Sequence, residues 1–565
     1  MWHYVVFLAV FFLVLTPVLF LVLGSFSTAS LPTDFSLATM GVFNYVEVYG
    51  DPATYALLTN TVIYVAGSVV LAISLATLLA WLVERTNVPL KVVIYAGVPM
   101  EMAMPGMLQA MAWVLLFSPR IGFINVVLMK IFGLSEAPVN IYSLGGMIFI
   151  EGTSLVSTAF LMLVPLFRNM DPALEEAAAV SGASPSSVAR KVTLRLLAPA
   201  LVAVTIYQAI SALERFEIPG ILGLPRGIYL FSTKIYSLVH SATFPPPYGQ
   251  ANALAMVYIA IALIGMYFYY RVIRRSERFA VVTGKGYRPR LIDLGPWRYP
   301  ALALVFLYLS VAIGLPFFTL LYASFLPYLQ TPSWEAFQLM TLKNYQMLSR
   351  SDGAAIALKN TVIVVFVSAT ATVLFSFAIS MVVVRSKFWG RRLLDQLAFV
   401  PHPLPGMVIA LAWVWVFLKL DFLPIYGTIW SICIAFLVSF MAYGTRMMNA
   451  AILQIHRELE EAAYTSGARP WRTMMRIFFP LMMPAFAGLW IWVALLAARV
   501  AGTPLMLAEG KNNMVLSILI WQMWDTGNIG GVAAIGTLLI FALMVLTVAI
   551  RFVAFRRQTS PVGRR

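Results

Sequence analysis

Long apolar runs recur along the whole chain, with short polar stretches between them. A helix of about 20 apolar residues crosses the roughly 30 Å hydrocarbon core of a bilayer, and these runs reach that length. A transmembrane β-barrel would instead show short segments in which apolar and polar residues alternate. The pattern therefore predicts an all-α polytopic membrane protein with about 12 transmembrane helices, six in each half. The predicted spans are 4–24, 55–83, 92–117, 143–167, 196–218, 248–270, 299–323, 357–384, 396–418, 425–449, 482–506 and 532–555.

Two apolar segments need separate interpretation. Segment 121–134 is too short to span a bilayer, so we predict an interfacial or re-entrant piece. The N-terminal run 4–23 has no Lys or Arg region before it and exceeds the apolar core of a signal peptide. We therefore expect a retained first helix and not a cleaved leader.

The composition excludes a soluble domain, because 61% of the residues are hydrophobic, only 11% are charged and the mean hydropathy is +0.86. The net charge of +16 does not predict nucleic-acid binding, since basic residues of membrane proteins gather in cytoplasmic loops that face anionic lipid. A single cysteine, Cys433, excludes an internal disulfide. The four histidines show no metal-ligand spacing, so no metal site and no cofactor are expected in this chain.

The distribution of Lys and Arg predicts the orientation. Segment 271–298 should be cytoplasmic, because it carries eight basic residues against Glu277 and Asp293. The loop 25–54 has three acidic residues and no Lys or Arg, so it should be external. With twelve spans, both termini then lie in the cytoplasm. The basic residues of the linker are Arg271, Arg274, Arg275, Arg278, Lys285, Arg288, Arg290 and Arg298, and those of the C-terminal tail are Arg551, Arg556, Arg557, Arg564 and Arg565.

The two halves repeat each other in sequence. The tetrapeptide NTVI at 60–63 returns at 360–363, and PGM at 105–107 returns at 405–407, both at an offset of 300. A shorter connection before the fifth span then reduces the offset to 285. Because six spans separate equivalent residues, the repeats are parallel and related by an axis along the membrane normal. We predict a first permease repeat at 1–270, a basic cytoplasmic linker at 271–298 and a second repeat at 299–565.

Two predicted cytoplasmic loops carry the most informative motif, LEEAAAVSGASPSSVARKVTLR at 174–195 and LEEAAYTSGARPWRTMMRIFFP at 459–480. Each pattern predicts a short helix, a glycine turn and a second helix that leads into the next span. The glutamates suit a helix N-terminus, the alanine pair leaves a slim surface for a partner, and the glycine allows a turn closed to larger residues. Pro185 and Pro470 suit the first turn of the second helix. Two such loops at equivalent places are hard to obtain by chance.

These loops resemble the signature of type I permeases of binding-protein-dependent ABC importers, which is E-A-A, three residues, G, nine residues and I-x-L-P. The first copy departs from it at Arg195, which replaces the proline, whereas the second keeps Pro480 and has Phe479 for the leucine. In that family the loop is a coupling helix that docks on the nucleotide-binding subunit. The resemblance implies coupling loops at about 171–195 and 456–480. The residues it assigns to coupling are Glu175, Glu176, Ala177, Ala178 and Gly182, and Glu460, Glu461, Ala462, Ala463 and Gly467.

The chain contains no G-x-x-x-x-G-K-[ST] phosphate loop, and its cytoplasmic loops are too short for an ATPase domain. It is therefore not expected to be an enzyme. The resemblance implies two copies of a separate cytoplasmic ABC ATPase, which would hold ATP and Mg²⁺, and an extracytoplasmic solute-binding protein. It also implies a multi-pass protein in the plasma (inner) membrane of a prokaryote.

Ionisable residues at membrane depth are candidates for the translocation path. Glu101 lies in the third span, Glu151 in the fourth, and Glu214, Arg215 and Glu217 near the end of the fifth. At the offset of 285, Glu214 corresponds to Arg499. In type I permeases the fifth span of each half lines the path at the pseudo-twofold interface. Our hypothesis is that Glu214 and Arg499 form a gate ion pair or touch the substrate, with Glu217 and Glu101 also on the path. The alternative is that these charges lie at the external interface or pair within their own half.

The fused arrangement resembles permeases for ferric iron and their relatives for thiamine, aminoalkylphosphonates and polyamines. Segment 216–236, followed by PPPYGQANALA at 245–255, most resembles the ferric-iron type. Ferric iron is thus the first expected substrate, and the other three solutes stay open. A 12-helix secondary transporter is the alternative class. It would also show parallel repeats but would not need the paired coupling loops.

Overall fold

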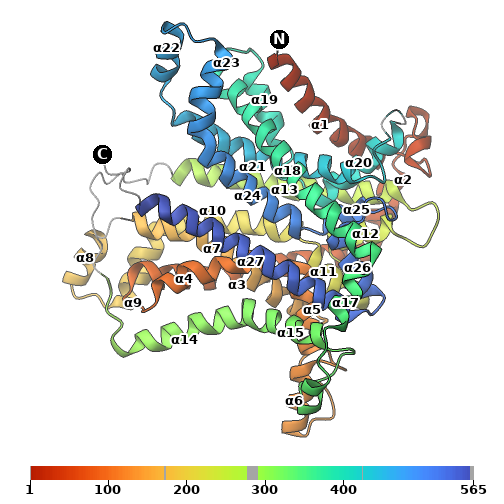
Figure 1. Cartoon of the computed structure of the whole chain (residues 1–565), viewed down its shortest axis with the longest axis vertical. Coiled ribbons are helices and arrows are strands. Elements are labelled where there is room, and N and C mark those ends of the chain that lie inside the picture. Colours follow the sequence, from red (N-terminus) through yellow and green to blue (C-terminus); the bar gives the residue numbers. More distant parts are fainter. Residues whose placement is uncertain (1, 171–172, 277–290, 421, 423, 560–565) are drawn as a thin grey trace. The chain divides into compact units, whose positions relative to one another are not determined.

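The computed structural model describes residues 2–170, 173–276, 291–420, 422 and 424–559. These residues are almost entirely helical, and the strand-like pairing among them is limited to two isolated bridges. Ten of the described helices are long and apolar enough to cross a membrane, or eleven spans if one bent pair is counted as a single span (Figure 1). The predicted all-α polytopic class is confirmed. Arg278, Lys285, Arg288 and Arg290 of the predicted linker, and Arg564 and Arg565 of the tail, lie outside the described residues.

The chain forms two compact units, and each combines parts of both sequence repeats. Unit 1 comprises Met1–Pro52, Lys234–Ile259 and Leu348–Thr526, and unit 2 comprises Ala53–Thr233, Ala260–Met347 and Gly527–Arg565. The repeat boundaries at 270 and 299 follow sequence equivalence, whereas the units follow packing. The repeat boundaries therefore stay a prediction.

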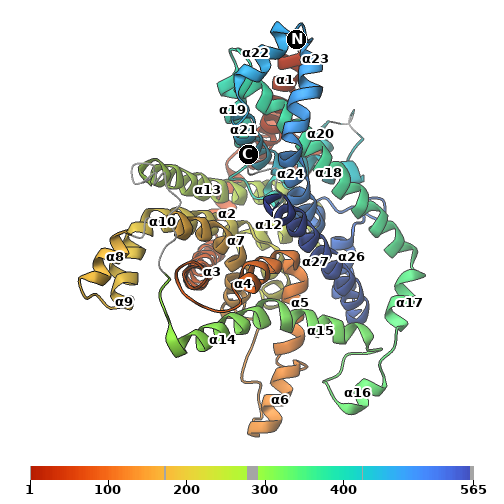
Figure 2. The same cartoon turned by 60° about the vertical axis from the view of Figure 1, so that its left-hand side comes forward.

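Unit 1 is built around α18, which packs along α21 and α24. The N-terminal helix α1 lies against α19 and α20 in both views (Figures 1 and 2). Val10 and Val14 of α1 are buried with Ile379, Leu394 and Met441. The first helix of the first repeat therefore packs on the core of the second. The helices are α1 (Trp2–Ser25), α18 (Asp352–Arg385), α19 (Arg391–Phe399), α20 (Gly406–Lys419), α21 (Ile429–Leu453), α24 (Phe479–Arg499), α25 (Gly502–Met506) and α26 (Leu516–Asp525).

Unit 2 shows the reciprocal arrangement. Its helices α14 and α15 begin the second repeat, yet Val305 and Tyr308 are buried with Ile94 and Leu155 of the first. Helix α15 also packs on α27 and α5. The helices are α3 (Pro52–Arg85), α4 (Lys91–Gly97), η3 (Val98–Ala103), α5 (Gly106–Phe117), α7 (Leu144–Asn169), α10 (Leu194–Glu214), α11 (Glu217–Leu222), α14 (Arg298–Leu309), the π-helical η8 (Ser310–Gly314), α15 (Leu315–Phe325) and α27 (Ile529–Thr559).

Two predicted spans are broken, which corrects the expectation of continuous helices at 92–117 and 396–418. In the first, the helix to Ala103 and α5 meet at 94°. In the second, α19 ends at Phe399 and the 14-residue α20 begins at Gly406. Pro105 and Pro405 directly precede the second helix of each pair, and proline lacks the N–H that a continuous helix needs. The ten long helices and the first broken pair account for eleven of the twelve predicted spans, and α19 with α20 occupies the twelfth, 396–418.

Two other predicted spans, 196–218 and 482–506, end earlier than expected. Helix α10 ends at Glu214 and α24 at Arg499, and a short helix follows each break. These short helices, α11 and α25, begin at Glu217 and Gly502, which are 285 residues apart. The breaks are therefore equivalent features of the two repeats.

Shorter helices complete the described chain. The predicted interfacial segment 121–134 contains α6, a ten-residue apolar helix that exposes Ile131 and Phe132. The others are η1 (Pro32–Asp34), η2 (Leu37–Thr39), α2 (Phe43–Gly50), α6 (Phe123–Phe132), η5 (Leu224–Arg226), α12 (Phe231–Val239), α13 (Tyr248–Ser276), η7 (Gly295–Trp297), α16 (Trp334–Gln338) and α17 (Lys343–Ser349).

Candidate functional site

Both predicted coupling loops form the expected helix, glycine turn and helix. The first consists of α8 (Ala173–Val180) and α9 (Pro185–Val188), and the second of α22 (Arg457–Thr465) and α23 (Pro470–Thr473). Gly182 and Gly467 have φ angles of 84° and 76°. A Cβ at either position would meet no atom within 4 Å. The left-handed backbone, and not lack of space, therefore requires glycine in both turns.

The residues assigned to coupling occupy similar places in the two segments. Glu175 and Glu176 lie in the first turn of α8 and Glu460 in the first turn of α22, where carboxylates oppose the positive end of the helix dipole. The first alanine of each pair is exposed and the second is half-buried; the pairs are Ala177 and Ala178, and Ala462 and Ala463. Glu461 is exposed, whereas Glu176 is half-buried. Each segment thus exposes a small alanine side chain beside acidic residues, and docking of an ATPase there stays a prediction.

Two arginines outside the motif contact the coupling segments, and sequence reasoning missed their role. Arg85 ends α3, is 2% exposed and lies 3.4 Å from the Glu175 carboxylate. Arg385 ends α18; its guanidinium donates to the carbonyl of Ile452 at the end of α21 at 3.0 Å and lies 5.5 Å from the ring centre of Phe478 in the second coupling segment. The two arginines are 300 residues apart. The repeat offset could therefore have identified them as an equivalent pair.

The exit of each coupling segment contains a π-helical turn. These turns, η4 (Ala189–Thr193) and η9 (Met474–Phe478), begin 285 residues apart. Arg195 and Pro480, where the two signatures differ, both lie beyond the turn. The departure of the first copy from the family signature therefore leaves the local backbone unchanged. Single π-turns inside helices occur often at functional sites.

Unit 2 contains a buried cluster of charges at the break between α10 and α11. Arg215 follows α10, and its Nε lies 3.2 Å from Oε1 of Glu151 on α7. Glu101 and Glu217 are electrostatic neighbours of both residues. The side chains of Glu101, Glu151 and Glu217 are 1%, 0% and 7% exposed. Among the described residues, this cluster thus sets three buried carboxylates against one guanidinium.

Hydrogen bonds and neighbouring rings complete the cluster. Ser154, one turn after Glu151, donates its hydroxyl to Glu101 at 2.8 Å. Tyr64 on α3 is an electrostatic neighbour of Glu151. Buried charges are costly unless they are paired and hydrogen-bonded. A buried cluster with surplus negative charge, built on helices that are apolar enough to span a membrane, is therefore a candidate for function.

The structure brings together part of the predicted path and adds to it. Glu101 and Glu217, two of the residues predicted for the path, lie in this cluster with Glu151 and Arg215. Their role on a translocation path stays a prediction. Glu214 ends α10 in unit 2 and Arg499 ends α24 in unit 1. Because each unit is described by itself, a Glu214–Arg499 pair stays a prediction.

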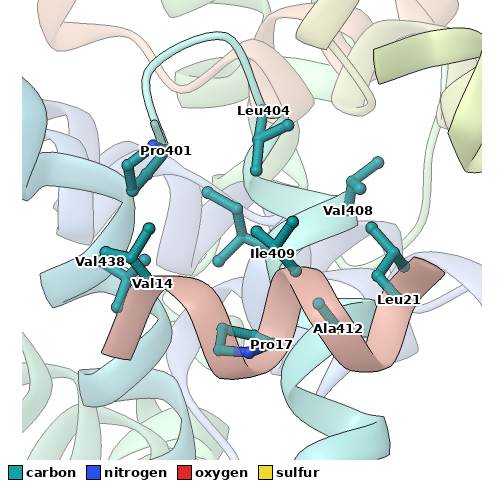
Figure 3. Close-up of a pocket in the computed structure, with 10 residues that line it drawn as sticks. Val14, Pro17, Leu21, Pro401, Leu404, Val408, Ile409, Ala412 and Val438 are labelled. Atoms are coloured by element: carbon teal, nitrogen blue, oxygen red, sulfur yellow. The ribbon is translucent and has the colours of Figure 1, made fainter. Parts of the chain in front are cut away.

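The equivalent positions of the second repeat are apolar. Helices α7 and α21 begin at Leu144 and Ile429, which supports the offset of 285 in the fourth span. At the offsets of 300 and 285, the replacements for the cluster residues are Pro401 for Glu101, Phe436 for Glu151, Val500 for Arg215, Gly502 for Glu217 and Val364 for Tyr64. Pro401 instead faces an apolar cavity of about 10 Å³ beside α1, lined by Val14, Pro17 and Ile409 among others (Figure 3). The residues that form the charged cluster in the first repeat are thus uncharged at the equivalent positions of the second, although Arg499 directly precedes Val500.

Among the described residues, no three His, Cys, Asp or Glu side chains are grouped so that they could hold a metal ion. The interactions of Glu101, Glu151 and Glu217 described above include those with Arg215.

The sequence matches the family described as "Binding-protein-dependent transport system inner membrane component" over residues 68–278 and 373–559. It is 25% identical to the ferric transport system permease protein FbpB of Actinobacillus pleuropneumoniae, over 76% of this chain and 61% of that protein. It is 26% identical to the putative ferric transport system permease protein FbpB 1 of Haemophilus influenzae, over 65% of this chain and 56% of that one. The chain thus spans less than two thirds of the length of these two relatives.

Other matches show the breadth of the family. A probable sulfate transport system permease protein of Nephroselmis olivacea is 28% identical, over 32% of this chain and 67% of that protein. A solved bacterial ABC transporter involved in the import of alginate is 18% identical, covers 46% of this chain and 96% of its own and has a TM-score of 0.37. A TM-score this low supports no structural conclusion. The family match covers more than half of the chain and parts of both repeats, which confirms the predicted resemblance: the chain belongs to the family of binding-protein-dependent transport system inner membrane components.

Proposed function

We propose that this chain is the permease subunit of an ATP-binding-cassette importer and forms the path for a solute delivered by an external binding protein. The observation that carries the proposal is the pair of coupling segments, α8–α9 and α22–α23. They share the glycine turn, the proline at the start of the second helix and the π-turn at the exit. A secondary transporter has no need of two such segments.

ATP hydrolysis then belongs to a separate subunit. The chain has no phosphate loop to hold a nucleotide. Two coupling segments imply two copies of a cytoplasmic ABC ATPase, which hold ATP and Mg²⁺, and the chain itself performs no covalent chemistry. We therefore expect the protein in the inner membrane of a prokaryote with both termini in the cytoplasm, and the basic residues at 271–298 and 551–565 support this orientation.

Ferric iron is the proposed substrate. The relatives named above include two described as ferric transport permeases. The buried cluster around Arg215 supports a cation over an anion such as sulfate, because its surplus carboxylates repel negative charge. Thiamine, an aminoalkylphosphonate or a polyamine imported by the same machine is the alternative. The two cationic solutes among these, thiamine and polyamines, agree equally with the cluster.

An uptake assay separates the classes of transporter and of substrate. The chain is reconstituted in proteoliposomes with its ATPase and binding protein, which we expect neighbouring genes to encode. Accumulation of radioactive ferric iron should require ATP and the binding protein and should survive collapse of ion gradients by ionophores. Uptake that needs a gradient but no ATPase would identify a secondary transporter. ATP-driven uptake of another candidate solute, but not of iron, would replace the substrate and keep the importer.

A further inference from the structure

Arg85 joins three helices at the entrance of the first coupling segment. One terminal nitrogen of its guanidinium lies 3.4 Å from Oε2 of Glu175 on α8, and the other donates to the Met170 carbonyl at 3.0 Å, just beyond α7. Because the planar guanidinium presents several donors in a fixed geometry, it can hold two such groups at once. The end of α3 is therefore tied to both the end of α7 and the first turn of α8.

Glu175 also contacts the last part of the coupling segment, where the chain leads into α10. Its second carboxylate oxygen, Oε1, accepts a hydrogen bond from the hydroxyl of Thr193, the last residue of the π-turn. The Glu175 side chain is only 13% exposed. This carboxylate thus links the buried arginine at the entrance to the threonine at the exit, and it points into the segment instead of toward solvent.

The second segment keeps the arginine and changes its partners. Arg385 donates to the carbonyls of Ile452 and Ile455, and Ile455 is the equivalent of Met170 at the offset of 285. Its guanidinium lies 5.5 Å from the ring centre of Phe478, the equivalent of Thr193. With phenylalanine in place of the threonine, Glu460 loses that donor and instead accepts from the hydroxyl of Tyr464 on its own helix. Arg385 therefore holds the second segment through backbone carbonyls and a ring.

We propose that Arg85 and Arg385 are positioning residues that fix the coupling segments to the membrane helices. We use the word clasp for the contacts of Arg85 with Met170 and Glu175 and of Glu175 with Thr193. Because Glu175 belongs to the clasp, Glu176 is left as the acidic docking residue of the first segment. The assignment of Glu176 rests on the proposed function, since docking requires an ATPase. The first segment then depends on the Glu175 carboxylate for its position, whereas the second does not depend on that of Glu460.

Spin labels can measure this difference in the permease alone. Cys433 is the sole cysteine, so a Cys433→Ala background accepts a single label at Val180→Cys or at its equivalent, Thr465→Cys. Both positions are exposed, Val180 by 89%. In nanodiscs without ATPase, Glu175→Gln should raise the mobile population at 180 about tenfold, because a charge-assisted bond is lost. The matched Glu460→Gln should leave the label at 465 unchanged.

Two further variants test the same contacts without removing the positive charge of the buried Arg85, whose loss could prevent folding. Thr193→Val keeps the size of the side chain but removes the hydroxyl, and it should raise mobility at 180 less than Glu175→Gln does. Arg85→Lys keeps the charge but not the two-pronged geometry, and it should fall between wild type and Glu175→Gln. Unchanged spectra for Glu175→Gln, or equal responses at 180 and 465, would overturn the clasp.

A second readout distinguishes positioning from docking. In the complex with the ATPase, Glu175→Gln should increase the ATP hydrolysed per solute imported and leave ATPase binding unchanged, while Glu176→Gln should weaken that binding. Weaker binding with Glu175→Gln, and no change at the label, would make Glu175 a docking residue. If no ATPase binds at all, the proposed function fails, and the spectra of the isolated permease still test the clasp.

Discussion

The two helix breaks at 215–216 and 500–501 have the same backbone arrangement, a long helix followed by a short one, but different side chains. In unit 2, Arg215 follows α10 and faces buried carboxylates, and in unit 1 the equivalent Val500 follows α24. The N-terminal glycine of the neighbouring helix contacts the short helix in both units, and the contact is tight only in unit 1. A Cβ on Gly106 would lie 3.7 Å from Cβ of Glu217, and one on Gly406 would lie 2.8 Å from Oγ1 of Thr503.

The comparison shows which features of a duplicated fold are fixed by geometry. The broken third and fifth spans of a repeat must meet, so the glycine and proline positions recur in both halves. The side chains at the break need only fill the space and satisfy their charges. Fusion into one chain lets each half vary these side chains independently. The buried carboxylates at the break in unit 2 thus have no acidic counterpart at the equivalent positions of unit 1, where the charged residue beside the break is Arg499.

The largest effect should come from Arg215→Gln, which leaves three buried carboxylates without their guanidinium. Breaking a buried ion pair on one side costs about 3–5 kcal/mol. Thermal unfolding in detergent should therefore begin well below the wild-type temperature. The matched control, Val500→Ala, removes only methyl groups at the equivalent break and should cost about 1 kcal/mol. Equal losses for the two variants would mean that the breaks do not differ in chemistry.

The glycine turns should respond alike in both halves, because here the repeats share backbone geometry. A β-branched residue in the left-handed region is strained by at least about 1–2 kcal/mol. Gly182→Val and Gly467→Val should each lower ATP-driven uptake about tenfold while the membrane helices stay folded. Circular dichroism provides the control for folding. A strong loss from one variant and none from the other would contradict equivalent coupling segments.

A charge pair between the repeats is the next test. If Glu214 and Arg499 meet on the path, Glu214→Gln and Arg499→Gln should each reduce transport about tenfold, since an opposite charge is left unpaired. The charge-swapped double variant, Glu214→Arg with Arg499→Glu, should recover part of the activity. Normal transport in both single variants would exclude the pair from the path.

The smallest effect should come from Glu101→Gln. The amide oxygen can still accept from Ser154, and the substitution removes one of the surplus negative charges from the cluster. We expect a change in stability within about 1 kcal/mol, of either sign. Unfolding measurements beside Arg215→Gln would check it. A loss as large as that of Arg215→Gln would mean that the Glu101 charge is itself required for folding.

Local features of the fold could be predicted from the sequence. Apolar length predicted the spans, and single residues such as Gly182 and Pro185 predicted the coupling segments, because these follow from backbone limits alone. The packing of α1 on α19 and α20 could not be predicted. A helix that is apolar all round carries no face that identifies its neighbour.

The site was only partly predictable for the same reason. Glu101 and Glu217 were recognised as charges at membrane depth, but their meeting with Arg215 and Glu151 depends on how four separate elements pack. Arg85 and Arg385 were visible as equivalents at the offset of 300. Their role appeared only when the carbonyls of Met170 and Ile455 were found beside them.

The most direct test of the central claim is the stoichiometry of the assembled complex. Native mass spectrometry of the permease, purified with the ATPase encoded beside it, should show one permease chain with two ATPase subunits. Gly182→Val and Gly467→Val should each weaken the retention of those subunits. A permease that retains no ATPase, yet still transports its solute, would contradict the account of two coupling segments that each seat one ATPase.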